Sequence, residues 1–298
     1  MKIAVTGYTG RLGSELVKAG CVPLDCDITN EDAVADNVVN LNPDVVINCA
    51  AYTDVDSCES PSIGQFRALR INFHGAERLR SNFGGLLIHL STDYVYDGKN
   101  GPYKETDRTK EAPVNFYGWS KLGAEVVLQT HSNQNTIIVR TTGLYGSSYK
   151  RDDFVSFLLN QLTTTTEGTI AIAKNVVGNQ TYVPHLVTAL MELCRRYDAN
   201  EMQGNMFHQI IHIASSDIVN RYEFALMIAS VFGHDPRRIV PTTKKFGVAD
   251  RPSKGGLKVD LAKKLGLPIY SILDGLKNLH ELSALDYMMA NDKGDLNV

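Results

Sequence analysis

The first half of the chain alternates short apolar runs with longer stretches in which apolar residues recur at helical spacing. This alternation predicts parallel strands joined by helices, with the fully apolar strands buried on both faces. We therefore expect an α/β fold, a Rossmann-type doubly wound parallel sheet with a smaller α/β C-terminal substrate domain. Strands are predicted over residues 2–7, 21–25, 44–51, 86–91 and 136–140, and helices over residues 11–20, 31–41, 62–82 and 116–131.

The periodicity loosens after Tyr145, where elements become harder to delimit. The remaining pattern predicts helices over 152–162, 182–197 and 221–233, a strand over 208–214, and a loop over 247–256. The polar tail, residues 291–298, is expected to fray.

Composition narrows the class of protein. The chain has 298 residues, of which 43% are hydrophobic and 21% charged, and a net charge of -3, so no general attraction to nucleic acid or to a membrane surface is expected. No apolar run approaches the roughly 20 residues that span a bilayer. Five cysteines without a CxxC pair indicate neither a disulfide framework nor a zinc site, and we expect no metal. The chain starts on a strand rather than a signal peptide, which favours a cytoplasmic location.

A glycine-rich turn follows the first predicted strand and opens the first predicted helix. The segment GYTGRLG contains Gly7, Gly10 and Gly13. Glycines in this context let the backbone approach a pyrophosphate, whose charge the helix N-terminus favours. The turn therefore indicates a dinucleotide cofactor, NADPH or NADH, although tight turns without a ligand can have the same spacing.

The choice between the two cofactors stays open in the sequence. An acid after the second strand would bind the ribose 2′-hydroxyl of NADH, and Asp25 and Asp27 are both placed for this. Arg11, beside the glycine turn, could instead bind the 2′-phosphate of NADPH or be a solvated residue of the first helical turn.

Tyr117 and Lys121 lie four positions apart in YGWSK, so on a helix they share a face. A lysine ammonium favours the phenolate form and is expected to lower the pKa of the tyrosine. Such a pair can act as a general acid toward a carbonyl group that is being reduced. The motif is common by chance, and its weight comes from following the glycine turn and a strand that ends in polar residues, HLSTDYVYDG.

These motifs together resemble the extended short-chain dehydrogenase/reductases. Within them, NCAAYTDVDSCE, STDYVYDG, YKETD, YGWSKLGAE, GNQTYVPHLV and HIASSDIVNRYEFALMIASVFG resemble the dTDP-4-dehydrorhamnose reductase family, over about residues 2–265. The resemblance implies a Rossmann domain over 1–145, with elements near 170–190 and 205–214 returning to it. Residues 146–298 would then mainly form a domain that binds a sugar nucleotide.

The resemblance also implies a role for each matching residue. Thr92 would donate a hydrogen bond to the 4-keto oxygen, Tyr117 would donate the proton, and Lys121 would tune Tyr117 and hold the nicotinamide ribose. Asn72 resembles a structural and proton-relay asparagine, and helix packing is the alternative. Substrate contacts would come from Thr92, Asp93 and Tyr94. Cofactor contacts would come from Gly7, Gly10, Arg11, Leu12, Gly13, Asp27, Ile28, Ala50, Ala51, Tyr52, Tyr117 and Lys121.

Relatives of that family carry out other reactions on the same scaffold. A 4,6-dehydratase has Asp-Glu after the threonine, whereas Asp93 is followed here by Tyr94, which argues against dehydration. A 4-epimerase uses the same tyrosine and lysine, so those two residues do not exclude it. A fucose-synthase-type epimerase/reductase would need a cysteine acid near the site, and residues 89–98 contain none.

Two departures from the reductase pattern keep a non-catalytic role open. The reductases carry a sugar-packing tryptophan where this chain has Gly143, and a late Ser and Asp where it has Gly255 and Lys258. One branch of the superfamily, similar to the beta subunit of methionine adenosyltransferase, keeps the fold and regulates a partner.

The remaining polar residues in apolar runs are interpreted as structural. His89, His185 and His212 are expected to be core or surface side chains rather than ligands, and Cys49 a small core residue. The sequence thus predicts an NAD(P)H-dependent oxidoreductase that reduces the 4-keto group of a nucleotide-linked 6-deoxy sugar. The expected partner is that substrate, with no nucleic acid or membrane, and a homodimer is left open.

Overall fold

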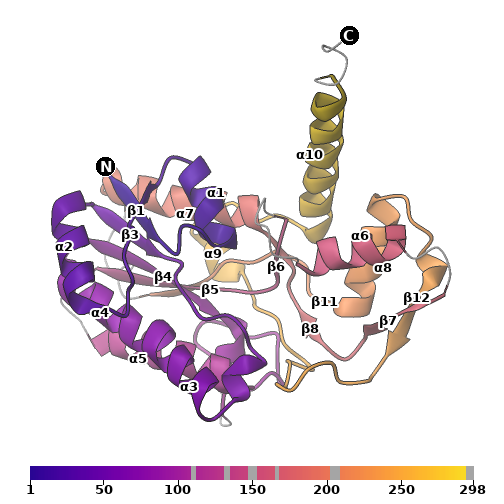
Figure 1. Ribbon diagram of the computed structural model, residues 1–298, viewed down its shortest axis with the longest axis horizontal. Coiled ribbons are helices and arrows are strands. Elements are labelled where there is room, and N and C mark those ends of the chain that lie inside the picture. The colour runs from indigo at the N-terminus through magenta and orange to yellow at the C-terminus, as the bar shows by residue number, and fades with distance from the viewer. Residues whose placement is uncertain (109–111, 131–134, 147–152, 165–167, 202–208, 293–298) are drawn as a thin grey trace.

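The computed structural model describes residues 1–108, 112–130, 135–146, 153–164, 168–201 and 209–292. Its centre is a six-stranded sheet in which every pair of neighbouring strands is parallel (Figure 1). The spatial order is β2 (Val22–Pro23), β1 (Ile3–Thr6), β3 (Val45–Asn48), β4 (Leu86–Thr92), β5 (Thr136–Thr141) and β10 (Ile210–His212). The predicted Rossmann-type α/β fold is confirmed.

Helices cover both faces of this sheet (Figure 1). One face packs against α1 (Arg11–Lys18) and α7 (Val183–Asp198), and the other against α2 (Glu31–Leu41), α4 (Gly75–Asn82) and α5 (Phe116–Thr130). Side chains alternate along a strand, so Val46 enters one core and its neighbour Ile47 the other. Burial of both faces explains why these strands are apolar throughout.

The order of the strands reverses between β1 and β3. From β1 the chain crosses to β2 on one side, and it then returns to β3 on the other side of β1. In open parallel sheets the connections diverge at such a point, and ligands bind in the crevice at the carboxyl ends of the strands. The glycine turn after β1 lies at this edge.

A second core lies beyond the end of the sheet. It is formed by α6 (Phe154–Thr164), α8 (Arg221–Val231), the first turns of α10 (Ile272–Asp292), and the parallel pair β7 (Ile170–Ala173) and β12 (Ile239–Thr242). Figure 1 shows α10 projecting from the body of the molecule. Two short pairs connect this core to the sheet: β6 (Leu144–Tyr145) with β9 (Thr181–Tyr182), and β8 (Val177–Gly178) with β11 (Val219–Asn220).

The long helix expected over 62–82 has a break in its hydrogen-bonding pattern. It consists of α3 (Ile63–Ala68), a π-helical turn η2 (Leu69–His74) and α4. The remaining short elements are η1 (Ser57–Glu59), η3 (Asp93–Val95), η5 (Pro236–Arg238) and α9 (Asp260–Lys264). Single π turns inside helices often occur at functional sites, and Asn72 lies in this one.

The four elements predicted after Tyr145 lie near their expected positions, whereas the strands β7, β8, β9, β11 and β12 and the helix α9 were not predicted. The strand expected over 208–214 is β10, at the edge of the sheet, and the helix expected over 182–197 is α7. In the segment 170–190, β7 joins β12 rather than the sheet. The α10 helix was not predicted. Of the tail expected to fray, residues 293–298 lie outside the described part of the chain.

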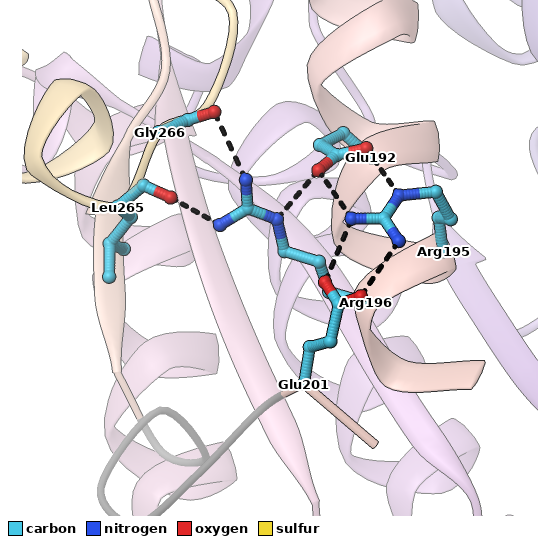
Figure 2. Close-up of polar contacts among 6 residues, drawn as sticks. All are labelled: Glu192, Arg195, Arg196, Glu201, Leu265 and Gly266. Atoms are coloured by element: carbon cyan, nitrogen blue, oxygen red, sulfur yellow. Dashed lines mark hydrogen bonds and ion pairs between the residues drawn. The ribbon is translucent and has the colours of Figure 1, made fainter. Parts of the chain in front are cut away.

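A polar cluster joins the end of α7 to the end of α9 (Figure 2). Arg196 donates to the carbonyl oxygens of Leu265 and Gly266 and to Glu192 at 2.7 Å. The last carbonyls of a helix lack intrahelical partners, so Arg196 satisfies groups that follow α9. Arg195 pairs with Glu192 and Glu201 on the more exposed side of the cluster.

Candidate active site

The glycine turn after β1 is shaped by close backbone contacts. Gly7 has a φ of +60°, and a Cβ there would lie 2.7 Å from the amide nitrogen of Ala50. A Cβ on Gly13 would lie 2.2 Å from the carbonyl oxygen of Gly7. Gly10 caps α1 without a side-chain hydrogen bond, which leaves the first amide groups of the helix available to an anion. The turn therefore suits a dinucleotide pyrophosphate.

A cavity of about 610 Å³ opens beside this turn, along the carboxyl ends of β1, β3, β4 and β5. Twelve of the residues predicted to bind cofactor or substrate line it: Gly7, Gly10, Arg11, Leu12, Gly13, Ala51, Tyr52, Thr92, Asp93, Tyr94, Tyr117 and Lys121. The cavity thus brings the glycine turn together with the three predicted catalytic residues.

Three predicted cofactor residues do not line this cavity. Asp27 is exposed and accepts a hydrogen bond from the amide of Thr29 at 2.8 Å, which lowers its pKa. The Ile28 side chain is buried beneath α4, so close to Gly75 that a Cβ on that glycine would lie 2.5 Å from it. Ala50 packs behind Gly7.

Arg11 lines the cavity, but its guanidinium is paired. One nitrogen lies 2.7 Å from a carboxylate oxygen of Asp153, just before α6, and the side chain is only 17% exposed. It is therefore not the solvated residue that one interpretation of the sequence expected. Asp25, which was considered as a ligand of the ribose 2′-hydroxyl of NADH, lies near Tyr8. The pKa of Tyr8 is raised mainly by a hydrogen bond to Asp25.

The end of β4 is held by its own polar side chains. Thr92 Oγ1 accepts a hydrogen bond from the amide of Tyr94 at 3.2 Å and donates to Asp93 at 3.2 Å. Asp93 is 3% exposed, and its burial raises the carboxyl pKa to about 6. Ser91 instead points to Glu125 of α5, to which it donates a hydrogen bond.

Tyr117 is placed by a close approach between α5 and the end of β4. The helix begins where Asn115 accepts a hydrogen bond from the amide of Gly118 at 2.9 Å. A Cβ on Gly118 would lie 2.0 Å from the carbonyl oxygen of Tyr94, so only glycine permits this approach. The rings of Tyr94 and Tyr117 meet edge to face with centroids 6.0 Å apart.

The titration of the Tyr117–Lys121 pair differs from the expectation. Burial raises the pKa of Tyr117, with Tyr94 and Asp93 adding to the effect, rather than Lys121 lowering it. Burial lowers the pKa of Lys121 to about 8. Desolvation disfavours the charged form of each group, so Tyr117 is a neutral phenol with a proton to donate. The expected lowering of its pKa was wrong for this arrangement.

Lys121 also contacts a polar group inside the sheet. Its Nζ lies 3.2 Å from Nε2 of His89, whose Nδ1 lies 3.0 Å from the side-chain nitrogen Nδ2 of Asn48. His89 is fully buried, as predicted for a core side chain. Its contact with Lys121 was not predicted, because the two residues come from different elements.

Asn72 forms hydrogen bonds that join three segments at the cavity. Its Oδ1 accepts from the amide of Tyr52 at 2.7 Å, and its Nδ2 donates to the carbonyl of Tyr52 at 3.1 Å and to Oγ of Ser120 at 2.8 Å. The π turn of η2 carries this residue. These contacts favour the structural role of Asn72 by fixing the loop after β3 against α5.

The two glycines that depart from the family pattern lie at sterically restricted positions. Gly143 has a φ of +59°, and a Cβ there would lie 2.5 Å from the carbonyl oxygen of Asn179. A Cβ on Gly255 would lie 2.6 Å from the carbonyl oxygen of Val177. Neither position accommodates a larger side chain without movement of the backbone. At position 258 the contact is made by the backbone: the carbonyl oxygen of Lys258 lies 3.0 Å from Nδ1 of His212.

Further cavity residues were not predicted. They are Cys49, Thr53, Asp54, Val55, Leu90, Ser91, Thr141, Thr142, Gly143 and Leu144. Most of them end or follow β3, β4 and β5, and the position of a residue just after a parallel strand is the signal that could have identified them. Cys49 was interpreted as a core residue, but it is half-buried and lines the cavity.

The described residues contain neither a metal-binding cluster nor a membrane-spanning helix. In those ranges, no group of three or more His, Cys, Asp or Glu side chains is arranged to hold a metal ion. None of the helices in the described part of the chain is long and apolar enough to cross a membrane.

The sheet, the glycine turn at its switch point and the Tyr117–Lys121 pair define an extended short-chain dehydrogenase/reductase. Within this class, the model of the RmlD substrate binding domain family matches residues 1–281, and the chain belongs to that family. It is 32% identical to a dTDP-4-dehydrorhamnose reductase of Mycolicibacterium smegmatis over 282 residues, 89% of this chain and 80% of that relative.

Two further comparisons bear on function. The chain is 29% identical to methionine adenosyltransferase 2 subunit beta of Danio rerio, over 91% of this chain and 86% of that protein. Its fold is similar to that of a dTDP-4-dehydrorhamnose reductase from Bacillus anthracis solved in complex with NADP, with a TM-score of 0.81, 27% identity and coverage of 94% of this chain and 99% of the other. The chain is therefore similar over most of its length both to dTDP-4-dehydrorhamnose reductases and to a subunit of methionine adenosyltransferase.

Proposed function

We propose that this protein reduces the 4-keto group of a nucleotide-linked 6-deoxy sugar with NADPH or NADH, and that it converts dTDP-4-dehydro-L-rhamnose to dTDP-L-rhamnose. One observation carries the proposal: Thr92, Tyr117 and Lys121 line the same cavity as the glycine turn. Membership in a family of nucleotide-sugar reductases supports it.

The residues at the glycine turn fit the cofactor. Gly7 and Gly13 leave spaces that a Cβ would fill, and the uncapped start of α1 favours a pyrophosphate. The bound reduced nicotinamide would supply the hydride that adds to the keto carbon. Tyr52 and Lys121 would hold its nicotinamide end, where they line the cavity.

Side chains of the protein would bind and protonate the keto oxygen of the substrate. The hydroxyl of Thr92, which donates to Asp93 in this structure, would turn to donate its hydrogen bond to the keto oxygen. Tyr117 would transfer its phenolic proton to that oxygen as hydride reaches the carbon, giving a hydroxyl group. Burial keeps Tyr117 protonated until this step. Asp93 and Tyr94 would contact the sugar nucleotide.

The assay uses purified protein, a panel of thymidine-, uridine- and guanosine-linked 4-keto-6-deoxy sugars, and either reduced cofactor. The absorbance of the reduced nicotinamide is followed. We expect consumption with the thymidine-linked L-sugar, and formation of the matching 4-hydroxy sugar. If neither cofactor is oxidised with any member of the panel, the reductase proposal fails.

A regulatory role is the second candidate, and the similarity to methionine adenosyltransferase 2 subunit beta favours it. Gly143, which offers no apolar face to a sugar, is consistent with it. The test is co-sedimentation with a methionine adenosyltransferase catalytic subunit. A stable complex that changes the rate of that enzyme, together with no reductase activity, would favour this role over the first.

A further inference from the structure

Four buried polar side chains form a line beneath the cavity. Thr6, Asn48 and His89 occupy paired positions on three neighbouring strands, β1, β3 and β4, and His89 leads to Lys121 of α5. All four side chains are at most 2% exposed. Burying such polar groups costs free energy unless their hydrogen bonds are satisfied. Each side chain is therefore oriented so that donors face acceptors.

The orientation of Asn48 is set by two donors. Its Oδ1 accepts from Thr6 Oγ1 at 2.7 Å and from the amide N–H of Ala50 at 3.2 Å. The amide N–H of Ala50 also reaches Oγ1 of Thr6 at 3.3 Å. A backbone N–H can only donate, so an Asn48 oxygen on this side avoids a contact between two donors, and the NH₂ group then faces His89. Nδ1 of His89, 3.0 Å away, is therefore an acceptor.

This orientation decides where His89 carries its proton. A neutral imidazole with an accepting Nδ1 bears its hydrogen on Nε2, and Nε2 is the atom 3.2 Å from Lys121 Nζ. Burial holds the pKa of His89 well below its ordinary value, and a protonated Lys121 would lower it further, so the ring is neutral in either state of the lysine. The Nε2–H group thus points at the lysine nitrogen. An uncharged amine has a lone pair that can accept this hydrogen bond, whereas an ammonium group has none.

Two further side chains, Glu125 and Cys49, act on the charge of Lys121. Burial lowers the pKa of Lys121 to about 8, while Glu125 of α5 and Cys49 after β3 act to raise it. Glu125 is itself engaged by Arg140, whose Nε lies 2.9 Å away. The hydrogen-bond donor of His89 acts in the same direction as burial, toward the neutral amine.

We propose that His89 is a positioning residue for Lys121: its Nε2–H group, oriented by Asn48 and Thr6, fixes the lysine amine at the floor of the cavity and favours its uncharged form. The role in catalysis rests on the proposed reductase function. A lysine that gains and loses a proton near neutrality can exchange protons with the site after Tyr117 has donated its own.

The matched control is a second buried histidine, His212, in the neighbouring part of the same sheet. It is also fully buried, and its Nδ1 lies 3.0 Å from the carbonyl oxygen of Lys258. A carbonyl only accepts, so Nδ1 of His212 must carry the hydrogen. The structure therefore assigns opposite tautomers to His89 and His212.

The first experiment is nitrogen NMR of the histidine side chains in the unaltered protein without cofactor. We expect the Nε2–H tautomer for His89 and the Nδ1–H tautomer for His212, both neutral at about pH 6, below the ordinary pKa of histidine. His89→Gln and His212→Gln assign the signals, and Lys121→Met assigns His89 if the first variant does not fold. An Nδ1–H or charged His89 would overturn the proposal.

The second experiment follows the titration of Lys121 by its Cε resonance. In His89→Gln the glutamine carbonyl can accept from an ammonium group, so we expect the midpoint to rise by about one pH unit, while His212→Gln leaves it unchanged. An unchanged midpoint in His89→Gln would refute the inference. Both readouts need no substrate, so they decide the role of His89 even if the assay of reductase activity is negative. If that assay is positive, the pH profile of kcat should shift in His89→Gln alone.

Discussion

Gly118 lies against the carbonyl oxygen of Tyr94 so closely that a Cβ on the glycine would be 2.0 Å from that oxygen. This contact fixes the start of α5 to the end of β4, and with it the position of Tyr117 relative to Thr92. Real Cβ atoms do not approach an oxygen at such a distance, so a larger residue must move the helix or the strand end.

We therefore expect Gly118→Ala to lower kcat by roughly 10²-fold, because displacement of reacting groups by about 1 Å has an effect of this size. The control on the same helix is Gly123→Ala, whose Cβ would meet the Phe73 ring at 3.4 Å, an ordinary contact. That variant should keep its activity and gain up to about 1 kcal/mol in helix propensity. Equal activities of the two variants would show that the Gly118 contact does not position the site.

Asn72 gives the second prediction, because its three hydrogen bonds join Tyr52 of the cavity wall to Ser120 of α5. Asn72→Ala should lower the free energy of unfolding by about 1–3 kcal/mol, since it leaves buried polar groups unpaired. Asn82→Ala, which removes one bond to the carbonyl of Arg78, is the control and should cost less. Urea denaturation measures both. A loss of kcat with unchanged stability would instead place Asn72 in proton transfer.

The buried carboxyl group of Asp93 predicts a dependence of stability on pH. Its pKa in the folded chain is about 6, above the value of about 3.9 in an unfolded chain. The unfolded state therefore loses this proton first, and the protein loses stability as the pH rises from about 4 through about 6. Asp93→Asn removes the ionisation. We expect the variant to be more stable than the unaltered protein by up to about 3 kcal/mol near pH 8, with no such gain near pH 4.

Asp97 is the control for the pH dependence of stability, because its pKa is shifted in the opposite direction to that of Asp93. Hydrogen bonds from Tyr103, the amide of Lys99 and Asn100 outweigh burial and lower its pKa. Its charged form is thus favoured in the folded chain, and Asp97→Asn should reduce stability near pH 7. Chemical denaturation across the pH range tests both variants. If Asp93→Asn follows the same pH curve as the unaltered protein, the carboxyl group is not held in its neutral form.

The cluster in Figure 2 provides a prediction away from the cavity. Arg196→Ala should cost about 1–2 kcal/mol, because the carbonyls of Leu265 and Gly266 lose their donor. Arg195→Ala should cost less than about 0.5 kcal/mol, since that side chain is 53% exposed. Bonds from Arg195 and Arg196 lower the pKa of Glu192 to about 2. The ionised Glu192 carboxylate therefore stabilises the folded chain fully above about pH 4.3, the ordinary pKa of glutamate. This stabilisation is lost as the pH falls toward 2. Thermal unfolding of the two variants at pH 7 and pH 3 measures these effects.

The sheet was predictable because its strands are buried on both faces, so β3 and β4 are apolar runs bounded by turns. The strands β6, β8, β9 and β11 were not, because each has only two residues and lies outside the regular alternation of strands and helices in the first half of the chain. Among the side chains of α10 that the structure describes, Ile272, Leu276 and Leu279 in its first turns join the second core. Its weak apolar face gave no clear signal.

The site was predictable where chemistry follows local order, as in the glycine turn and the Tyr117–Lys121 pair. It was not predictable where partners are distant in sequence, as for Arg11 with Asp153 or His89 with Lys121. The reason for glycine at position 143 was also hidden, because the carbonyl of Asn179 that excludes a side chain comes from a later segment.

The most direct test of the central claim is the rate of Tyr117→Phe with the thymidine-linked 4-keto sugar and reduced cofactor. The substitution removes only the phenolic hydroxyl, and Tyr222→Phe in the second core is the matched control. We predict that kcat falls by about 10²–10⁴-fold in Tyr117→Phe and is unchanged in Tyr222→Phe, with both variants folded. A folded Tyr117→Phe that retained most of the rate would contradict the assignment of Tyr117 as the proton donor.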